Sequence, residues 1–282
     1  MLKIEIKKAT RNIMFIITLI VAVIITMFSA VHVINQYYDT IAYDNISESL
    51  MNDITNPDYA MISLFNSWIG QEWISVGEAL FYLLLPFFST LAYSWSLNSE
   101  QKSGYEKQII TRTYRKKYYI SKYFSVFIAG GLVIVIPMLL NFMVVAMFIP
   151  AIEPDIFYDM YYGMNTTQVF STLFFAHPYM FVAYRLISNF IFAGLFATMG
   201  MSLTFFIKNK FLIVTIPFLL SLILSYISSY HFLPFVFSPV HFLHGGGDAY
   251  TTSIFVMIFE ALFMFVVSFV ITIVRGEKDD IF

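Results

Sequence analysis

Three charged residues stand inside long apolar runs of the sequence: Glu78, Arg185 and Glu260. A lone charge inside a membrane costs about 3 kcal/mol, so such residues usually pair with each other or face water. Arg185 and Glu260 have opposite signs, and the helical rise predicts depths of roughly 9 and 12 Å from the same face. Two interpretations stay open: an Arg185–Glu260 ion pair that joins two helices, or a polar path lined by Glu260 or Glu78.

A second group of reactive side chains is the pair His241 and His244, followed by three glycines and Asp248. Imidazoles with a nearby carboxylate are metal ligands in many proteins. The chain has no H-E-x-x-H sequence, however, and the glycines favour a flexible turn over a rigid ligand cage. All five histidines fall at or outside the outer ends of the apolar runs, which argues against an intramembrane hydrolase. We therefore expect neither a metal site nor a catalytic residue in this chain.

The densest run of cations lies between Asn98 and Lys122, where seven residues are Lys or Arg. Gly104 interrupts this run, and the residues from Tyr105 onward predict one or two short amphipathic helices. One interpretation is a loop that lies on acidic lipid, to which each cation contributes about 1 kcal/mol. The other interpretation is a binding surface for a partner protein.

The elements that carry these residues are membrane-spanning helices. Hydrophobic residues make up 59% of the 282 residues and charged residues only 12%, and the mean hydropathy is +0.75, which is far too apolar for a soluble domain. A helix that spans the lipid needs about 20 apolar residues, and the sequence predicts six such helices at about 13–33, 74–97, 123–149, 179–207, 211–229 and 252–274. We expect one all-α transmembrane domain over residues 1–282. The absence of cysteine excludes disulfides and thiolate zinc sites, and the net charge of −2 gives no indication of nucleic-acid binding.

The distribution of cations predicts how the helices are oriented. Fifteen of the 16 Lys and Arg residues fall on one side of the six predicted spans, and Arg185 is the exception. The positive-inside rule makes that side cytoplasmic, with both termini on it. Leu2–Lys8, which precedes the first span, predicts an amphipathic helix at the membrane interface.

Two segments on the other side are unusual. The loop 34–73 is long and carries six acidic residues and no basic one. That composition follows from topology alone, or it forms an acidic vestibule for a cationic substrate. Between spans five and six, Phe232–Phe242 is apolar but short and broken by proline, which predicts a re-entrant outer segment.

The order of residues in the basic run resembles the ABC-2 family of ABC-transporter permeases. In that family an E-x-x-[SG]-G stretch follows the second span, a helical stretch of apolar and basic residues comes next, and a Lys opens the third span. The resemblance implies a region, residues 98–122, that couples the permease to a separate ATPase. The positions that match or carry it are Glu100, Ser103, Gly104, Lys107, Ile110, Arg112, Arg115, Lys116 and Lys122.

The resemblance also implies partners. The chain has no G-x-x-x-x-G-K-[ST] loop, so ATP and Mg²⁺ are expected in a partner ATPase subunit. A second permease copy or a related chain is expected to complete the transporter in the plasma membrane of a bacterium. The expected function is export of a peptide, antibiotic or lipid-like substrate. The alternative is a proton-coupled secondary carrier that uses Glu260 and Glu78.

Overall fold

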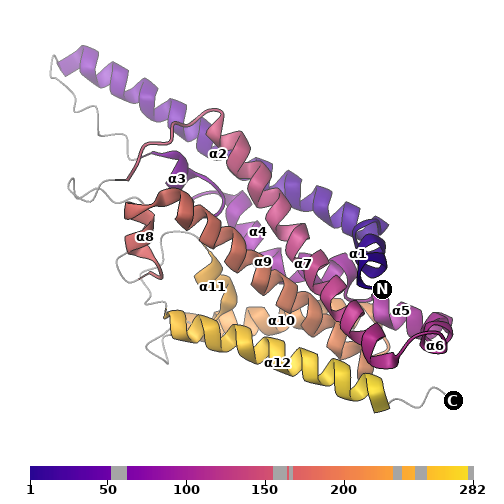
Figure 1. The fold of residues 1–282 in the computed structure, drawn as a ribbon. Coiled ribbons are helices and arrows are strands. Elements are labelled where there is room, and N and C mark those ends of the chain that lie inside the picture. Colours follow the sequence, from indigo (N-terminus) through magenta and orange to yellow (C-terminus); the bar gives the residue numbers. More distant parts are fainter. Residues whose placement is uncertain (52–61, 155–163, 165–167, 231–236, 245–252, 279–282) are drawn as a thin grey trace.

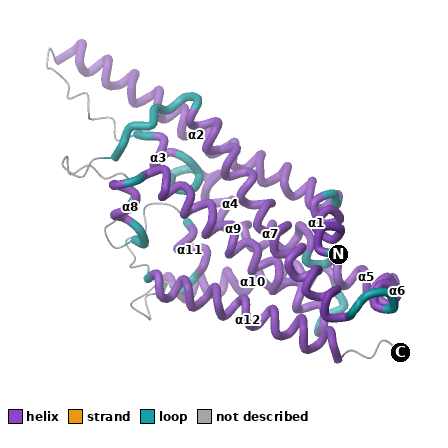
Figure 2. Tube along the Cα trace, in the orientation of Figure 1, coloured by secondary structure: helices purple, strands orange, loops and turns teal. Residues whose placement is uncertain are grey.

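The computed structural model describes residues 1–51, 62–154, 164, 168–230, 237–244 and 253–278. Within these ranges the chain contains helices and loops and no strand (Figure 2). Twelve α-helices and one short 3-10 helix follow one another along the described residues. They are α1 (Leu2–Thr10), α2 (Ile13–Met51), α3 (Leu64–Ser67), α4 (Val76–Tyr93), α5 (Ser96–Ser103), α6 (Tyr105–Ile110), α7 (Arg115–Ala146), α8 (Ser171–Ala176), α9 (Pro178–Ser202), η2 (Leu203–Phe205), α10 (Lys210–Ser229), α11 (Pro239–Leu243) and α12 (Ile254–Lys278).

The long helices run side by side in one bundle (Figure 1). The N-terminus, α1, α5, α6 and the end of α12 lie together at one end of this bundle, which we call the terminal end. Helices α3 and α8 lie toward the other end, which we call the distal end. Six helical stretches are long and apolar enough to cross a membrane, which confirms the predicted number; they cover Ile13–Ala42, Val76–Lys102, Arg115–Ala146, Pro178–Phe205, Lys210–Ser229 and Ile254–Glu277.

Two helices extend beyond the predicted membrane spans, for the same reason. Helix α2 continues to Met51 rather than ending near residue 33, and α7 begins at Arg115 rather than at residue 123. Polar residues end an apolar span, but polar and cationic residues are compatible with a helix, and neither stretch contains Gly or Pro to interrupt it. Residues 115–122, assigned to a connecting region, therefore form the first two turns of α7.

Helices α4, α7 and α9 form the centre of the bundle. Small residues bring α7 and α9 close together: a Cβ added at Gly130 would lie 2.4 Å from the Cβ of Ala197. Helices α2, α10 and α12 lie outside this centre and expose large apolar side chains such as Phe28, Ile223 and Phe259. Such faces are expected where helices meet lipid.

Buried hydroxyl and amide groups connect the helices. The hydroxyl of Thr90 in α4 donates a hydrogen bond to the Val214 carbonyl of α10 at 3.0 Å, and Ser94 donates to the Ala197 carbonyl of α9 at 2.7 Å. The side chain of Asn141 in α7 donates to the Thr26 carbonyl of α2 and accepts from the backbone of Ile69. These bonds satisfy polar groups that have no access to water.

Helix α11 is a short buried helix that packs against α4, α9, α10 and α12. It contains the end of the segment predicted to re-enter the membrane. Residues 231–236 lie outside the described residues, so the re-entrant course stays a prediction.

Candidate functional site

Four charged side chains meet at the terminal end of the bundle. Oε1 of Glu100 in α5 lies 2.9 Å from Nζ of Lys122 in α7 and accepts a hydrogen bond from Lys8 in α1. Nζ of Lys122 also lies 3.3 Å from Oε2 of Glu5 in α1. The other carboxylate oxygen of Glu100 accepts a hydrogen bond of 2.5 Å from the Tyr118 hydroxyl. We call Glu5, Lys8, Glu100, Tyr118 and Lys122 the Glu100 cluster.

The ion pairs of the Glu100 cluster are buried, which strengthens the link they form between helices. The side chain of Lys122 is fully buried, and those of Glu5 and Glu100 are nearly so. The ammonium group of Lys122 also lies 4.6 Å from the centre of the Tyr93 ring, at the end of α4. A buried charge is strongly destabilising without its partner. The cluster therefore holds α1, α4, α5 and α7 in one arrangement.

Lys8 lies at the edge of this cluster and is partly exposed. Burial alone lowers the pKa of Lys8, but the hydrogen bond and the negative charge of Glu100, with a smaller contribution from Glu5, outweigh it and raise the pKa above its usual value. Lys8 is therefore positively charged at neutral pH and shares the Glu100 carboxylate with Lys122.

The turn between α5 and α6 depends on Gly104. Its φ of +72° lies in the left-handed region, which is strained for other residues. The Glu106 carboxylate at the start of α6 accepts a hydrogen bond from the Tyr119 hydroxyl of α7. Ile109 and Ile110 of α6 pack against the core. Helix α6 is thus attached to α7 on one face.

Several exposed side chains of α6, of the following loop and of the start of α7 are cationic. Lys107, Arg112, Tyr114 and Lys116 have exposed side chains, and Tyr114 is 87% exposed. We call these four residues the coupling surface. Arg115 does not belong to it, because its guanidinium group is half-buried and donates to the Glu277 carbonyl of α12 at 3.1 Å. Of the predicted coupling residues, Glu100 and Lys122 are buried beneath this surface, whereas Ser103 is exposed beside it.

The three predicted intramembrane charges do not form one site. The guanidinium group of Arg185 donates hydrogen bonds of 3.2 Å to the carbonyls of Phe242, Leu243 and His244, and one of 3.0 Å to Oε1 of Gln71. Among the described residues no ion pair joins Arg185 to Glu260, whose Oε2 atom is buried without a hydrogen bond. The contacts of Arg185 instead join α9 to the end of α11 and to the segment before α4.

Glu78 lies next to this arrangement. Its side chain is 1% exposed, and its Oε2 atom is 3.0 Å from Nε2 of His244. Glu78 and Arg185 therefore both contact the residue that follows α11, from α4 and α9 respectively. Imidazole and carboxylate at this distance can share a proton.

Sequence reasoning missed the role of Glu72, which was assigned to the acidic loop 34–73. Its carboxylate is buried and accepts hydrogen bonds from the hydroxyls of Ser29 and Ser75. Its other oxygen accepts from the backbone of Ser75 at 3.1 Å. Glu72 therefore fixes the start of α4 against α2. Because its carboxylate is buried and hydrogen-bonded, Glu72 is not available to bind a substrate.

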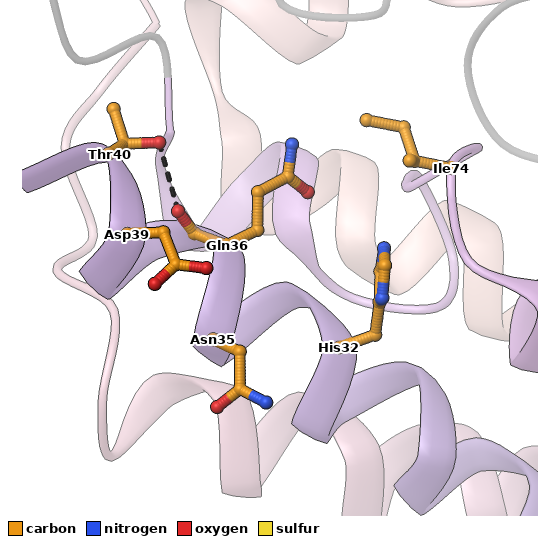
Figure 3. A pocket seen from close by; sticks show the side chains of 6 residues that line it. All are labelled: His32, Asn35, Gln36, Asp39, Thr40 and Ile74. Carbon is orange, nitrogen blue, oxygen red and sulfur yellow. Dashed lines mark hydrogen bonds between the residues drawn. The ribbon is translucent and has the colours of Figure 1, made fainter. Parts of the chain in front are cut away.

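The start of the segment predicted as the loop 34–73 belongs to α2 and lines an open pocket of about 590 Å³. Figure 3 shows polar side chains that α2 contributes to this pocket, with Ile74 facing them from the segment before α4. The described residues that line it are His32, Asn35, Gln36, Asp39, Thr40 and Ile74, and among these Asp39 is the one acidic residue. The pocket lies in part of the predicted vestibule, and its described lining is mostly uncharged.

His241 and His244 point to different partners. Nε2 of His241 lies 3.3 Å from the Ser225 carbonyl, whereas Nε2 of His244 faces Glu78. No group of three His, Asp or Glu side chains is placed to hold a metal ion within the described residues. Asp248, the third member of the candidate metal site, lies outside them.

No protein-family model, no curated protein and no solved structure matches this chain. The functional assignment therefore depends on the geometry of the terminal end and on the order of its residues.

Proposed function

We propose that this chain is the membrane subunit of an ATP-driven exporter of the ABC-2 type, with its terminal end in the cytoplasm of a bacterial cell. The observation that carries the proposal is the Glu100 cluster. Its buried ion pairs join α5 and α7, the helices on either side of α6 in the chain, to α1, and α7 is long and apolar enough to cross a membrane. The charge asymmetry of the sequence supports the orientation.

In this proposal the coupling surface binds an acidic groove of a separate ATPase, which binds ATP and Mg²⁺. A movement of the ATPase displaces α5 and α6, and the Glu100 cluster transmits it to α1, α4 and α7. Packed helices with buried ion pairs move as a unit, because separating them exposes uncompensated charges. A second permease chain completes the pathway for a peptide, antibiotic or lipid-like substrate.

Charge reversal on the coupling surface tests the proposal. We expect the double variant Arg112→Glu and Lys116→Glu to reduce copurification of the ATPase encoded beside this chain by at least about tenfold, because like charges across an interface repel. Both side chains are exposed, so expression and membrane insertion should not change. The measurement is the ratio of ATPase to permease after affinity purification.

Lys3→Glu is the matched control for this experiment. Lys3 is an exposed cation on α1, outside the coupling surface, and its reversal should leave the ratio near that of the wild type. Equal losses in both variants indicate a general charge effect, and an unchanged ratio in the double variant contradicts the proposed docking site.

A second candidate function is a proton-coupled carrier that uses Glu78 and Glu260. The specific observation in its favour is Glu78, a nearly inaccessible carboxylate 3.0 Å from an imidazole nitrogen. The two functions differ in their energy source. Substrate efflux that stops on ATP depletion and persists with a protonophore supports the exporter, and the opposite pattern supports the carrier.

A further inference from the structure

A pocket of about 370 Å³ opens at the terminal end, between α1 and the junction of α4 with α5. Its lining contains hydroxyl, amide and ammonium groups, the carboxylate of Glu100 and aromatic rings. The lining residues include Lys8, Asn12, Trp95, Ser96, Ser99 and Glu100. Neither the coupling surface nor the Glu78 site uses this pocket.

The polar groups of the pocket have hydrogen-bonding capacity left for a ligand. Ser96 is buried beside the Tyr93 hydroxyl, and its hydroxyl oxygen forms no hydrogen bond of normal distance and angle. The hydroxyl oxygen of Ser99 accepts a hydrogen bond of 3.2 Å from Nζ of Lys210, so the hydroxyl proton of Ser99 is available to an acceptor. Two hydroxyl donors on one face of α5, with lysines on both sides, favour a ligand with anionic oxygens.

The charge around the pocket also favours an anion. Lys8, Lys122 and Lys210 lie around it, against the carboxylates of Glu5 and Glu100. The oxygens of Glu100 already accept bonds from Lys8, Lys122 and Tyr118, so its charge is compensated within the Glu100 cluster. The remaining positive charge belongs to Lys210, whose ammonium lies 5.2 Å from the centre of the Trp95 ring.

The surroundings of the pocket indicate that the anion belongs to a lipid. The apolar residues of α4 end at Tyr93, and Trp95 follows at the level where tryptophan is enriched in membrane proteins. Each polar anchor is followed by a face suited to acyl chains. Ile13 comes after Asn12 and is 68% exposed, and Phe211 comes after Lys210 and is 69% exposed.

We infer that this pocket binds the phosphodiester headgroup of an acidic phospholipid. Ser96 and Ser99 donate to the phosphate oxygens, Lys210 supplies the uncompensated positive charge, and the acyl chains lie along the starts of α2 and α10. A bound lipid would brace α1 against α5, next to the Glu100 cluster. The inference does not depend on the proposed ATPase, because the site lies within one chain.

Native mass spectrometry of the purified chain tests this inference. The chain is titrated in detergent with phosphatidylglycerol or with phosphatidylcholine of the same acyl chains. We expect phosphatidylglycerol to bind about tenfold more tightly, and Lys210→Met to remove most of this preference, as loss of one charge-assisted contact does. Ser96→Ala should weaken phosphatidylglycerol binding by a smaller factor without changing the charge.

Lys117→Met serves as the matched control, because Lys117 is an exposed cation at the same end that does not line the pocket. Its lipid preference should equal that of the wild type. Equal binding of the two lipids, or an equal loss in Lys117→Met and Lys210→Met, overturns the inference. Displacement of phosphatidylglycerol by sn-glycerol 3-phosphate at comparable concentration also overturns it, since the site would then recognise a soluble phosphoester.

Discussion

Replacing Lys122 with methionine is expected to lower the stability of this protein by about 3–5 kcal/mol, which is the usual cost of removing one partner from a buried ion pair. Lys122 is fully buried and contacts both Glu5 and Glu100. Methionine fills a similar volume but leaves two carboxylates with one remaining lysine. The measurement is thermal unfolding of the purified protein in detergent, where the midpoint should fall by roughly 10 °C.

The matched control is Lys117→Met, an exposed position on the same helix, where a change of less than about 1 kcal/mol is expected. Adding Glu5→Gln to Lys122→Met should cause less further loss than Glu5→Gln causes alone, because the second carboxylate is already uncompensated. Equal midpoints for Lys122→Met and Lys117→Met would contradict the structural role of the Glu100 cluster.

Replacing Arg185 with leucine is expected to be comparably damaging. The guanidinium group donates to three successive carbonyls, of residues 242–244, and to Gln71. Leucine leaves these acceptors without that donor in a buried site, and each buried acceptor without a partner costs about 1–3 kcal/mol. We expect a large fall in the yield of folded protein after gel filtration, together with a thermal midpoint lowered by roughly 10 °C.

Glu260→Gln is the informative comparison for Arg185→Leu. One of the two interpretations of the sequence paired these residues, but their contacts differ, because Arg185 has four hydrogen bonds and Oε2 of Glu260 has none. Glutamine has nearly the same shape as glutamate but cannot ionise. The free energy of unfolding of this variant should therefore lie within about 1 kcal/mol of that of the wild type. Equal destabilisation by both changes would restore the ion-pair interpretation.

Hydropathy predicted the number of spans because a helix that crosses lipid must be apolar along its whole length, and this property can be read from one continuous stretch of sequence. Twenty apolar residues in a row have few alternatives to crossing a membrane. Helix ends are a different matter, since the helix of α7 continues through Arg115–Lys122 although the apolar run does not. Local composition reports where lipid ends, and it does not report where hydrogen bonding of the backbone ends.

The side-chain contacts within the sites could not be predicted from the sequence, because they join residues that lie far apart along the chain. Glu100 and Lys122 were singled out by their position in a motif, but Glu5, the second carboxylate that contacts Lys122, lies 117 residues from it. Gln71 lies 114 residues from Arg185 in a segment taken for a loop. One available signal was overlooked: Asn141 is a strong hydrogen-bonding group within an apolar run, which predicts a partner on another helix.

The distance in sequence between Glu5 and Lys122 has a consequence for synthesis of the chain. Helix α1 is translated before α7, so its buried Glu5 carboxylate cannot contact Lys122 until residue 122 has been made. Until then we expect α1 to stay at the bilayer surface while the apolar stretches of α2 and α4 insert into the membrane. A nascent chain truncated before residue 122 should therefore leave α1 accessible to protease.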